Sequence, residues 1–368
     1  MPKFDRRRFL QTSLGTAAAA PLLSGIESLL AAEANEANGK LTIAPFRFDV
    51  TPPMGHSLCG GWIKPVEAVD DPLEAIGFVL SGAGKPIVLC AVDWTGLLND
   101  AHVQWRTALA EAAGTTPERV AVQCVHQHNA PFACLDAEKL ILEQGELPHI
   151  VELDYFHSCL ERGRQAITEA LETAQPVTHV AHGQAQVEKV ASNRRVFRDE
   201  TGKVKAMRGS SCKEEELRAL PEGLIDPWLK TVAFYNGETK VVACHYYATH
   251  PMSYYGDGRV SSDFAGLARK KRQADQPDCT HIYFTGCAGN IAAGKYNDGS
   301  HEARVKLTER VYDGLVNSEA TLKPQPLAGV AWMTKDILPE PRDTLSQEEL
   351  AAQISNRQNA VVGRNRPS

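Results

Sequence analysis

The sequence lacks the repeating patterns that define several large protein classes. It contains no internal repeat, no heptad pattern and, beyond its N-terminal segment, no low-complexity tract, which excludes solenoid and coiled-coil architectures. Its 9 cysteines form no CxxC pair and show no spacing typical of a small disulfide-bonded domain. Several of them, such as Cys90, Cys124 and Cys244, lie inside apolar runs and are expected to pack as small hydrophobic side chains.

The chain also lacks a strong excess of one charge. Its 39 basic and 45 acidic residues give a formal net charge of −6, and the basic residues are scattered apart from the extreme N-terminus. This distribution gives no electrostatic basis for binding nucleic acid or an anionic membrane surface. With 368 residues, 43% of them hydrophobic, the chain is long enough to bury a substantial core in one large domain or two ordinary ones.

The N-terminus contains a pattern typical of protein export. Three arginines at 6–8 precede an uncharged run over 12–23 and an Ala-rich stretch that reaches Ala34. Residues 1–34 resemble a twin-arginine export signal, which predicts a periplasmic or extracellular protein. The apolar run is too short and too Ala-rich for a stable membrane span. Proteins with such signals are exported already folded, often with a metal inserted, and export permits a disulfide, although an odd cysteine count leaves one thiol over.

Strand-like and helix-like segments alternate along the rest of the chain. Apolar runs typical of strands occur at 41–50, 75–80, 86–92, 120–125, 231–235, 240–247, 281–285 and 329–334. Helical periodicity occurs at 101–113, 155–173, 264–273, 302–315 and 345–357, the last with the capping-box pair Ser346 and Glu349. Several strands are apolar on both faces, which is typical of strands between helices. We therefore predict an α/β fold with a mixed β-sheet core covered by helices, and a long surface excursion at 198–222.

Two histidines one residue apart follow the apolar segment 120–125. Because successive side chains of a strand point to opposite faces, His126 and His128 would project the same way, roughly 6.5 to 7 Å apart along the chain. They follow the end of a buried strand, where sites of open α/β sheets are commonly built. The pair is therefore either part of a metal site or two hydrogen-bonded histidines at a strand end.

A second cluster begins where the segment 240–247 ends. His250 alone would be structural, but together with the first pair it supplies the third imidazole that a zinc centre could use. Asp263 or Ser262 is expected to cap the helix that follows. His245 would lie on the opposite strand face and is predicted to be a core residue.

A third cluster, the glycine-rich segment 286–299, contains the spacing GxxxxGK from Gly289 to Lys295, which is typical of phosphate-binding loops. Nucleotide binding is not predicted, because Tyr296 stands where such loops have Ser or Thr and the Asn-Asp-Gly sequence at 297–299 favours a turn where a helix should continue. We interpret the glycines as a loop whose backbone lies close to a substrate or metal.

The three clusters, in this order, resemble the N-terminal catalytic domain of the neutral/alkaline non-lysosomal ceramidases. The resemblance covers residues 41–335 and starts with Asp-Val-Thr-Pro-Pro at 49–53, which is similar to that family's Asp-Ile-Thr segment. The segment His-Gln-His-Asn-Ala-Pro at 126–131 resembles the family's Thr-His-Thr-His-Ser-Gly-Pro motif. His250 lies in a segment similar to the zinc-binding Ala-x-His, and Asn193-Arg194 resembles the family's Asn-Arg pair.

The resemblance implies a role for each of these residues. His126 and His250 would bind zinc, and His128 would lie behind them or stabilise a developing oxyanion. Arg194 would hold the substrate or its reacting carbonyl, although the sequence alone allows a surface arginine equally well. The implied substrate is a small-molecule or lipid amide, and the implied cofactor is zinc.

Polar residues at strand ends and element junctions are candidate partners of the ligand histidines: Asp49, Asp93, Asp263 and Asn290. A turn or capping role is the preferred interpretation of Asp49 and Asp263.

Two departures from the family pattern leave two functions open. Ala292 stands where the family has its serine nucleophile, so a metal-activated water is the remaining mechanism. The family's glutamate and tyrosine zinc ligands come from a segment farther along than residue 368, so 336–368 is interpreted as an incomplete C-terminal extension. The chain is expected to be a zinc-dependent hydrolase of amide (ceramide-like N-acyl) or ester bonds. The alternative is a non-catalytic ceramidase-like ligand-binding protein.

Overall fold

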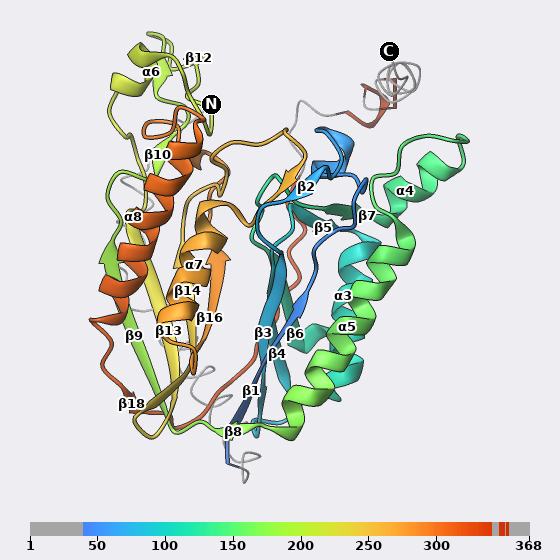
Figure 1. The fold of residues 1–368 in the computed structure, drawn as a ribbon, viewed down its shortest axis with the longest axis vertical. Helices are drawn as coiled ribbons and strands as arrows, with labels where there is room; N and C mark the ends of the chain where they lie inside the picture. Colours follow the sequence, from blue (N-terminus) through green and yellow to red (C-terminus); the bar gives the residue numbers. More distant parts are fainter. Residues whose placement is uncertain (1–39, 341–345, 350, 353–368) are drawn as a thin grey trace.

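Two β-sheets lie face to face in the centre of the molecule, and helices cover the outer side of each, which gives four layers (Figure 1). The structure is a computed structural model that describes residues 40–340, 346–349 and 351–352. The predicted α/β class with mixed sheets and covering helices is confirmed. The core consists of two mixed sheets, and each packs against helices on one face only.

The first sheet consists, in spatial order, of β6 (Val120–Cys124), β4 (Ile87–Val92), β3 (Glu74–Ser81), β1 (Thr42–Asp49) and β8 (Gln175–Pro176). Strands β4 and β6 are parallel, and the other neighbours are antiparallel. Helix α3 (Asp100–Ala113) makes the crossover from β4 to β6, and α5 (Leu153–Glu172) packs beside it.

The second sheet repeats this plan. It consists of β16 (Thr280–Thr285), β14 (Thr239–Tyr247), β13 (Trp228–Asn236), β9 (His179–Gln186) and β18 (Gln325–Pro326). Strands β14 and β16 are parallel, and α7 (Asp263–Asp275) makes the crossover between them, with α8 (His301–Glu319) packed against it. Each sheet therefore carries one parallel pair at its edge, formed by a crossover helix on its outer face.

Strand β3 shows why the strands are apolar on both faces. Ala75 and Val79 belong to the core under α3 and α5, whereas Ile76 and Phe78 belong to the core between the sheets. The ring centroid of Phe78 lies 5.5 Å from that of Phe234 in the opposite sheet. Full burial of such side chains stabilises the fold by about 1.5–3 kcal/mol each.

Short strand pairs tie together the loops at one end of the sheets. They are β5 (Gly96–Leu98) with β7 (Phe132–Cys134), β10 (Ser192–Asn193) with β17 (Ile291–Ala292), and β2 (Ala68–Val69) with β15 (Arg259–Val260). Helix α4 (Leu135–Leu142) follows β7 directly. These pairs fix the loops that carry the histidines described below.

All strands predicted up to residue 285 and all helices predicted up to residue 315 are present. The strand predicted at 329–334 is wrong, because residues 327–340 form no strand pairing in the described chain. The indole of Trp332 packs against the inter-sheet core, and its Nε1 donates to the carbonyl of Glu118 at 2.8 Å. The apolar run thus reflects packing across the seam between the sheets.

The long surface excursion predicted at 198–222 contains a small hairpin of β11 (Phe197–Arg198) and β12 (Val204–Ala206), followed by α6 (Glu215–Ala219). The buried guanidinium of Arg208 organises it by donating to the carbonyls of Leu217, Leu220, Pro221 and Asn193. At the other end of the chain, the Glu349 amide donates to Ser346 Oγ at 3.1 Å, as the capping pattern predicted. The predicted export signal at 1–34, and residues 353–368, lie outside the described residues.

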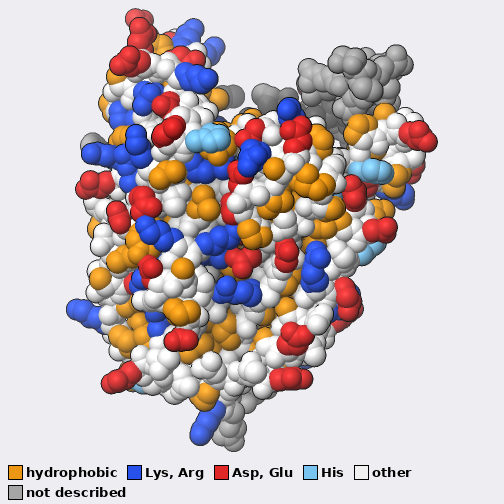
Figure 2. Space-filling view, in the orientation of Figure 1, with side chains coloured by type: hydrophobic (Ala, Val, Ile, Leu, Met, Phe, Trp, Pro, Cys, Tyr) orange, Lys and Arg blue, Asp and Glu red, His pale blue; other side chains and the backbone are white. Residues whose placement is uncertain are grey.

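All nine cysteines lie within the described residues, and none of them is paired. Cys90 and Cys244 are buried as predicted, whereas Cys124 is half-buried. Among the helices of the described residues, none is long and apolar enough to cross a membrane. Figure 2 shows acidic and basic side chains mixed over the face that it draws.

Candidate metal centre

The carboxyl ends of the two parallel strand pairs meet at one end of the molecule. There the edge strands β6 and β16 are joined, because Gln123 Nε2 donates to the Thr285 carbonyl at 2.9 Å and Thr285 Oγ1 donates to the Val125 carbonyl at 2.6 Å. The loops that follow β6 and β14 carry the predicted histidines. Loops beyond the carboxyl ends of parallel strands are where open α/β sheets place their ligands.

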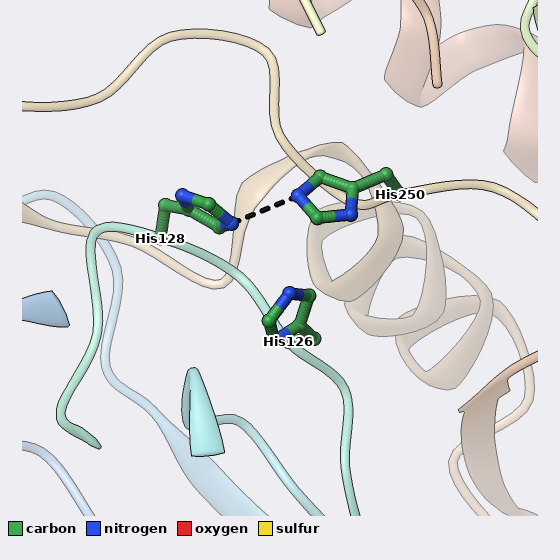
Figure 3. A group of neighbouring side chains, drawn as sticks. All are labelled: His126, His128 and His250. Atoms are coloured by element: carbon green, nitrogen blue, oxygen red, sulfur yellow. Dashed lines mark hydrogen bonds between the residues drawn. The ribbon is translucent and has the colours of Figure 1, made fainter. Parts of the chain in front are cut away.

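Three imidazole rings converge at this end of the sheets. The ring centroids lie 5.2 Å apart for His126 and His128, 4.8 Å for His126 and His250, and 4.8 Å for His128 and His250. One ligand nitrogen from each ring lies within 4.8 Å of the others. Figure 3 shows the rings turned toward one another from two separate loops. We refer to these three residues as the histidine cluster.

His126 is held by the backbone around it. Its φ of 80° is unusual for a residue with a side chain, so the chain turns at His126. The alternation of side chains along a strand is therefore not what brings the rings of His126 and His128 together. The amide of His126 donates to the Trp94 carbonyl at 3.0 Å, and its Nδ1 lies 2.6 Å from the Thr95 carbonyl. Because a carbonyl only accepts, Nδ1 carries the proton and Nε2 is left as a free electron-pair donor.

His128 and His250 form a hydrogen bond across the two sheets. Their Nε2 atoms lie 2.8 Å apart, so one of the two carries the proton. On its other side His128 faces Cys59, with 3.9 Å between Nδ1 and Sγ, and its ring meets that of Tyr255 edge-on at 5.1 Å. Burial, together with His126 and Arg194, lowers the pKa of His128 to about 4. Both partners are therefore neutral at pH 7.

The backbone around His250 is fixed by the glycine-rich loop. The His250 amide donates to the Ile291 carbonyl at 3.0 Å, and His250 forms a parallel β-bridge with Ala292. Burial lowers the pKa of the imidazole strongly, and the nearby charge of Arg194 lowers it further. An imidazole that resists protonation is ready to bind a cation instead.

The histidine cluster fits a zinc ion in its ligand chemistry. Three neutral imidazole nitrogens with space for a water are one of the common donor sets of catalytic zinc sites. Two nitrogens bound to one tetrahedral zinc at about 2.0–2.1 Å lie about 3.3 Å apart. The 2.8 Å separation between His128 and His250 is shorter, so a common ion would replace their hydrogen bond and move the rings apart by about 0.5 Å.

Arg194 approaches the cluster from the loop after β10. It contributes to lowering the pKa of both His128 and His250, which places its charge close to them. One guanidinium nitrogen donates to Ser210 Oγ at 2.5 Å, while Nε is buried without a protein partner. Burial lowers the pKa of Arg194 itself. Arg194 therefore acts electrostatically on His128 and His250, and its Nε has unused hydrogen-bonding capacity.

The candidate acidic and amide partners have other contacts. Asp49 is exposed and accepts from the Thr51 amide at 2.6 Å, which is the preferred turn role. Asp93 is buried, where it accepts from the Glu74 amide and from Arg269, both at 3.1 Å. Neither carboxylate contacts a histidine of the cluster among the described hydrogen bonds.

Asp263 and Asn290 support the cluster through the backbone. Asp263 accepts from the Phe264 amide at 2.6 Å and from the Ser253 amide at 3.0 Å, so it anchors the loop that carries His250. Its φ of 52° belongs to the left-handed region, which aspartate tolerates better than most residues. The Asn290 carbonyl accepts from the Arg194 amide at 2.8 Å.

Asn297 is a supporting residue that the sequence showed only as a turn former. Its side chain is fully buried, and its Nδ2 donates to the Ser210 carbonyl at 2.8 Å and to the Ser253 carbonyl at 2.7 Å. Ser210 accepts from Arg194, and Ser253 lies three residues beyond His250. Asn297 therefore links the Arg194 arm of the site to the His250 arm.

The glycine-rich loop has no phosphate-binding geometry. Lys295 Nζ donates to the Arg218 carbonyl at 2.9 Å and also to Leu220, so its ammonium caps α6. Ala292 is fully buried beside His250 and pairs with Ser192 in the β10–β17 ladder. The position where the resemblance expected a serine nucleophile thus lies next to the histidine cluster.

A second group of buried side chains has the composition of a metal site. Its members are His245, predicted as a core residue, His281 and Glu319. Glu319 already accepts from Arg272 Nε at 2.9 Å and forms an ion pair with Lys240. An added cation would meet two buried positive charges, so this group fits an ion-pair network rather than a metal centre.

Comparison with known proteins shows similarity in structure but not in sequence. No family model matches the chain, and no curated protein sequence matches it. The structure of neutral ceramidase from Pseudomonas aeruginosa superimposes with a TM-score of 0.59 and 15% identity, over 76% of this chain and 45% of that one. A structure described as ceramidase complexed with C2 gives a TM-score of 0.55 and 14% identity, over 77% and 45%.

The matched region thus spans less than half the length of these ceramidases. At this identity the similarity is one of architecture. The chain therefore has a ceramidase-like α/β fold.

Proposed function

We propose that this protein is a zinc-dependent hydrolase of amide or ester bonds, with N-acyl amides similar to ceramide among its candidate substrates. The observation that carries the proposal is the convergence of His126, His128 and His250 from loops of both sheets. The fold shared with ceramidases supports the same chemistry by analogy.

We assign all three imidazoles to the metal. The resemblance gave His128 a supporting role, but its Nε2 lies 2.8 Å from that of His250. Its ring centroid lies 4.8 Å from that of His250 and 5.2 Å from that of His126. Zinc bound there would lower the pKa of a bound water toward ~7 and polarise a carbonyl. The Thr95 carbonyl holds His126 in the tautomer that presents Nε2.

In this proposal Arg194 stabilises negative charge on the substrate oxygen. Its Nε has no protein partner, and its guanidinium is half-buried, where a charged hydrogen bond is stronger than in water. Asn297 and Ser210 hold the guanidinium at a fixed place relative to His250. Ala292, which lies beside the cluster, has no hydroxyl that could act as a nucleophile. This agrees with direct attack by a water molecule.

The proposed location is outside the cytoplasm, by the twin-arginine route. The support is the arginine cluster at 6–8 followed by an uncharged run in the sequence. Cell fractionation tests this, with lysine substitutions at Arg6 and Arg7 expected to retain the protein in the cytoplasm. Export that is unaffected by these substitutions would contradict the proposal.

The alternative function is that of a non-catalytic ligand-binding relative. Ala292 in place of a nucleophile favours it. Hydrolysis of a panel of N-acyl amides and esters by the purified, zinc-loaded full chain separates the two functions. We expect turnover that His126→Ala abolishes and that the exposed control His157→Ala preserves. Stoichiometric zinc without turnover on any member would favour the binding protein.

A further inference from the structure

An open pocket of about 610 Å³ begins at the histidine cluster and leads away from it. Its walls come from both sheets, with Leu97 and Val122 on one side and Ala288 and Gly289 on the other. His126 and His250 both line the pocket. Its volume is in the range of small-molecule sites, which is about 300–1,000 Å³.

Arg194 does not line the pocket. The residues that line the pocket, all of them within the described chain, do not include His128 either. A substrate whose carbonyl oxygen faces Arg194 would therefore extend another of its groups into the pocket.

Within the described chain, no Asp, Glu, Lys or Arg side chain lines the pocket. Burial lowers the pKa of its His102, which is neutral at pH 7. Burying a charge without a partner is strongly unfavourable, whereas burying an apolar chain is favourable. The pocket therefore selects an uncharged, mainly apolar group.

Gly289 is the glycine of this loop that backbone geometry does not explain. Gly299 has a φ of 86°, and a Cβ at Gly294 would lie 2.0 Å from the Gly209 carbonyl oxygen, so both positions require glycine. Gly289 is exposed, its φ is not positive, and a Cβ built on it meets no atom within 4 Å. The missing side chain at Gly289 leaves the pocket open at that wall.

We infer that this pocket binds an uncharged apolar chain of the substrate and that Gly289 is a specificity-determining residue that sets how bulky this chain can be. The inference rests on the proposed function for the identity of the reacting bond. The binding of the chain itself follows from the walls of the pocket and can be measured without catalysis.

Binding of straight-chain amides to the purified full chain tests the pocket directly. From acetamide to octanamide, we expect Kd to fall by about fourfold for each methylene that enters the pocket. Gly289→Leu should weaken octanamide binding by about tenfold or more and leave acetamide unchanged. Octylammonium, which has a similar chain with a charged end, should bind more weakly than octanamide to the wild type.

Gly329→Leu is the matched control. Gly329 is exposed, has no positive φ, and a Cβ there meets no atom within 4 Å, but it does not line the pocket. Both leucine variants should keep the wild-type circular dichroism spectrum and melting temperature. Octanamide that binds no more tightly than acetamide, or equally to wild type and Gly289→Leu, would overturn the inference.

Turnover identifies which part of the substrate the pocket holds. N-methyloctanamide carries the chain on the acyl side, and N-octylacetamide carries it on the amine side. The substrate whose kcat/KM falls in Gly289→Leu has its chain in the pocket, and a fall for neither overturns the inference. If octanamide binding is lost in Gly289→Leu but no substrate is hydrolysed by the wild type, the pocket stands and the proposed hydrolase function fails.

Discussion

The Nε2 atoms of His128 and His250 lie 2.8 Å apart although 122 positions separate the two residues in the chain. His128 belongs to the loop after the first sheet's edge strand, and His250 follows β14 in the second sheet. The histidine cluster therefore exists only when the two sheets are packed against each other. An ion bound there would connect the two halves of the fold.

Zinc is accordingly expected to stabilise the folded chain. A ligand that binds only the native state at 100 times its Kd raises the free energy of unfolding by about 2.7 kcal/mol. We expect the melting temperature to rise with added zinc and the rise to disappear in His126→Ala. Calorimetry should show metal affinity reduced by more than about 100-fold in that variant, beyond the effect typical of an outer-sphere residue.

His128→Ala tests whether the third imidazole is a ligand. A ligand role predicts a loss of zinc affinity similar to that of His250→Ala, whereas a supporting role predicts a loss of about 10–100-fold. His157, exposed on α5, provides the control substitution to alanine, which should leave affinity unchanged. A zinc-dependent rise in melting temperature that survives in all three cluster variants would mean that zinc binds elsewhere.

Asn297→Ala is expected to destabilise the fold and to impair catalysis. The substitution removes donors to two buried carbonyls, those of Ser210 and Ser253, and each unsatisfied group costs about 1–3 kcal/mol. Denaturant unfolding should therefore show a loss of about 2–5 kcal/mol. Asn317→Ala, on the exposed face of α8, should change stability by less than about 0.5 kcal/mol.

The catalytic part of this prediction depends on Arg194. If Asn297 acts by holding Arg194, the double variant Asn297→Ala, Arg194→Ala should lose less activity than the two single losses combined. Strict additivity of the two losses in kcat/KM would restrict Asn297 to a structural role. Circular dichroism on each variant separates loss of fold from loss of positioning.

Most of the fold was predictable because several central strands, such as β3, β4, β14 and β16, are apolar on both faces. Strand β9 was not predicted, because its sequence HVAHGQAQ is polar and alternates between half-buried and exposed positions. Hydrogen bonding to β13 along its whole length makes it a strand in spite of this composition. The strand prediction at 329–334 was wrong for the opposite reason. This segment is apolar because it packs where the two sheets meet, and such a segment has the same composition as a strand.

For the candidate site, the sequence predicted the three histidines but not the residues that hold them in place. The three histidines were recognisable because each follows a strand end. Thr95 acts through its backbone carbonyl and Asn297 through a buried amide, and neither contact leaves a local pattern in the sequence. Conversely, Asp49 and Asp93 lie at strand ends but have other roles. Asp49 forms a turn, and Asp93 forms an ion pair with Arg269.

The buried group of His245, His281 and Glu319 predicts loss of stability in acid. Burial, with nearby Lys240 and Arg272, lowers the pKa of His245 to about 4 and that of His281 to about 2. Burial opposes ionisation of Glu319, but the hydrogen bonds from Arg272 and the surrounding charges lower its pKa to about 2. All three groups therefore bind protons more readily in the unfolded chain than in the native one.

The sign of the effect follows from these shifts. Above about pH 6.5 both histidines are neutral in either state, so their contribution to stability is complete. As the pH falls below about 6.5, the unfolded state gains protons that the native state does not, and each histidine weakens folding by roughly tenfold per pH unit. Urea unfolding between pH 7.5 and 5 should show a shallower decline for His281→Gln than for wild type. His182→Gln, exposed on β9, should keep the wild-type slope, and an unchanged slope in His281→Gln would contradict the assignment.

The route of attack can be read from covalent intermediates. A wild-type chain that uses water should form no acyl-enzyme with an activated ester, as measured by intact-protein mass spectrometry. Ala292→Ser places a hydroxyl beside His250, because residues paired in a β-bridge carry their side chains on the same face. That variant is expected to accumulate an acyl-enzyme. Ala293→Ser, one residue along and equally buried, faces the other way and should remain unmodified. An acyl adduct on the wild type would show that another side chain is the nucleophile and that direct attack by water is wrong.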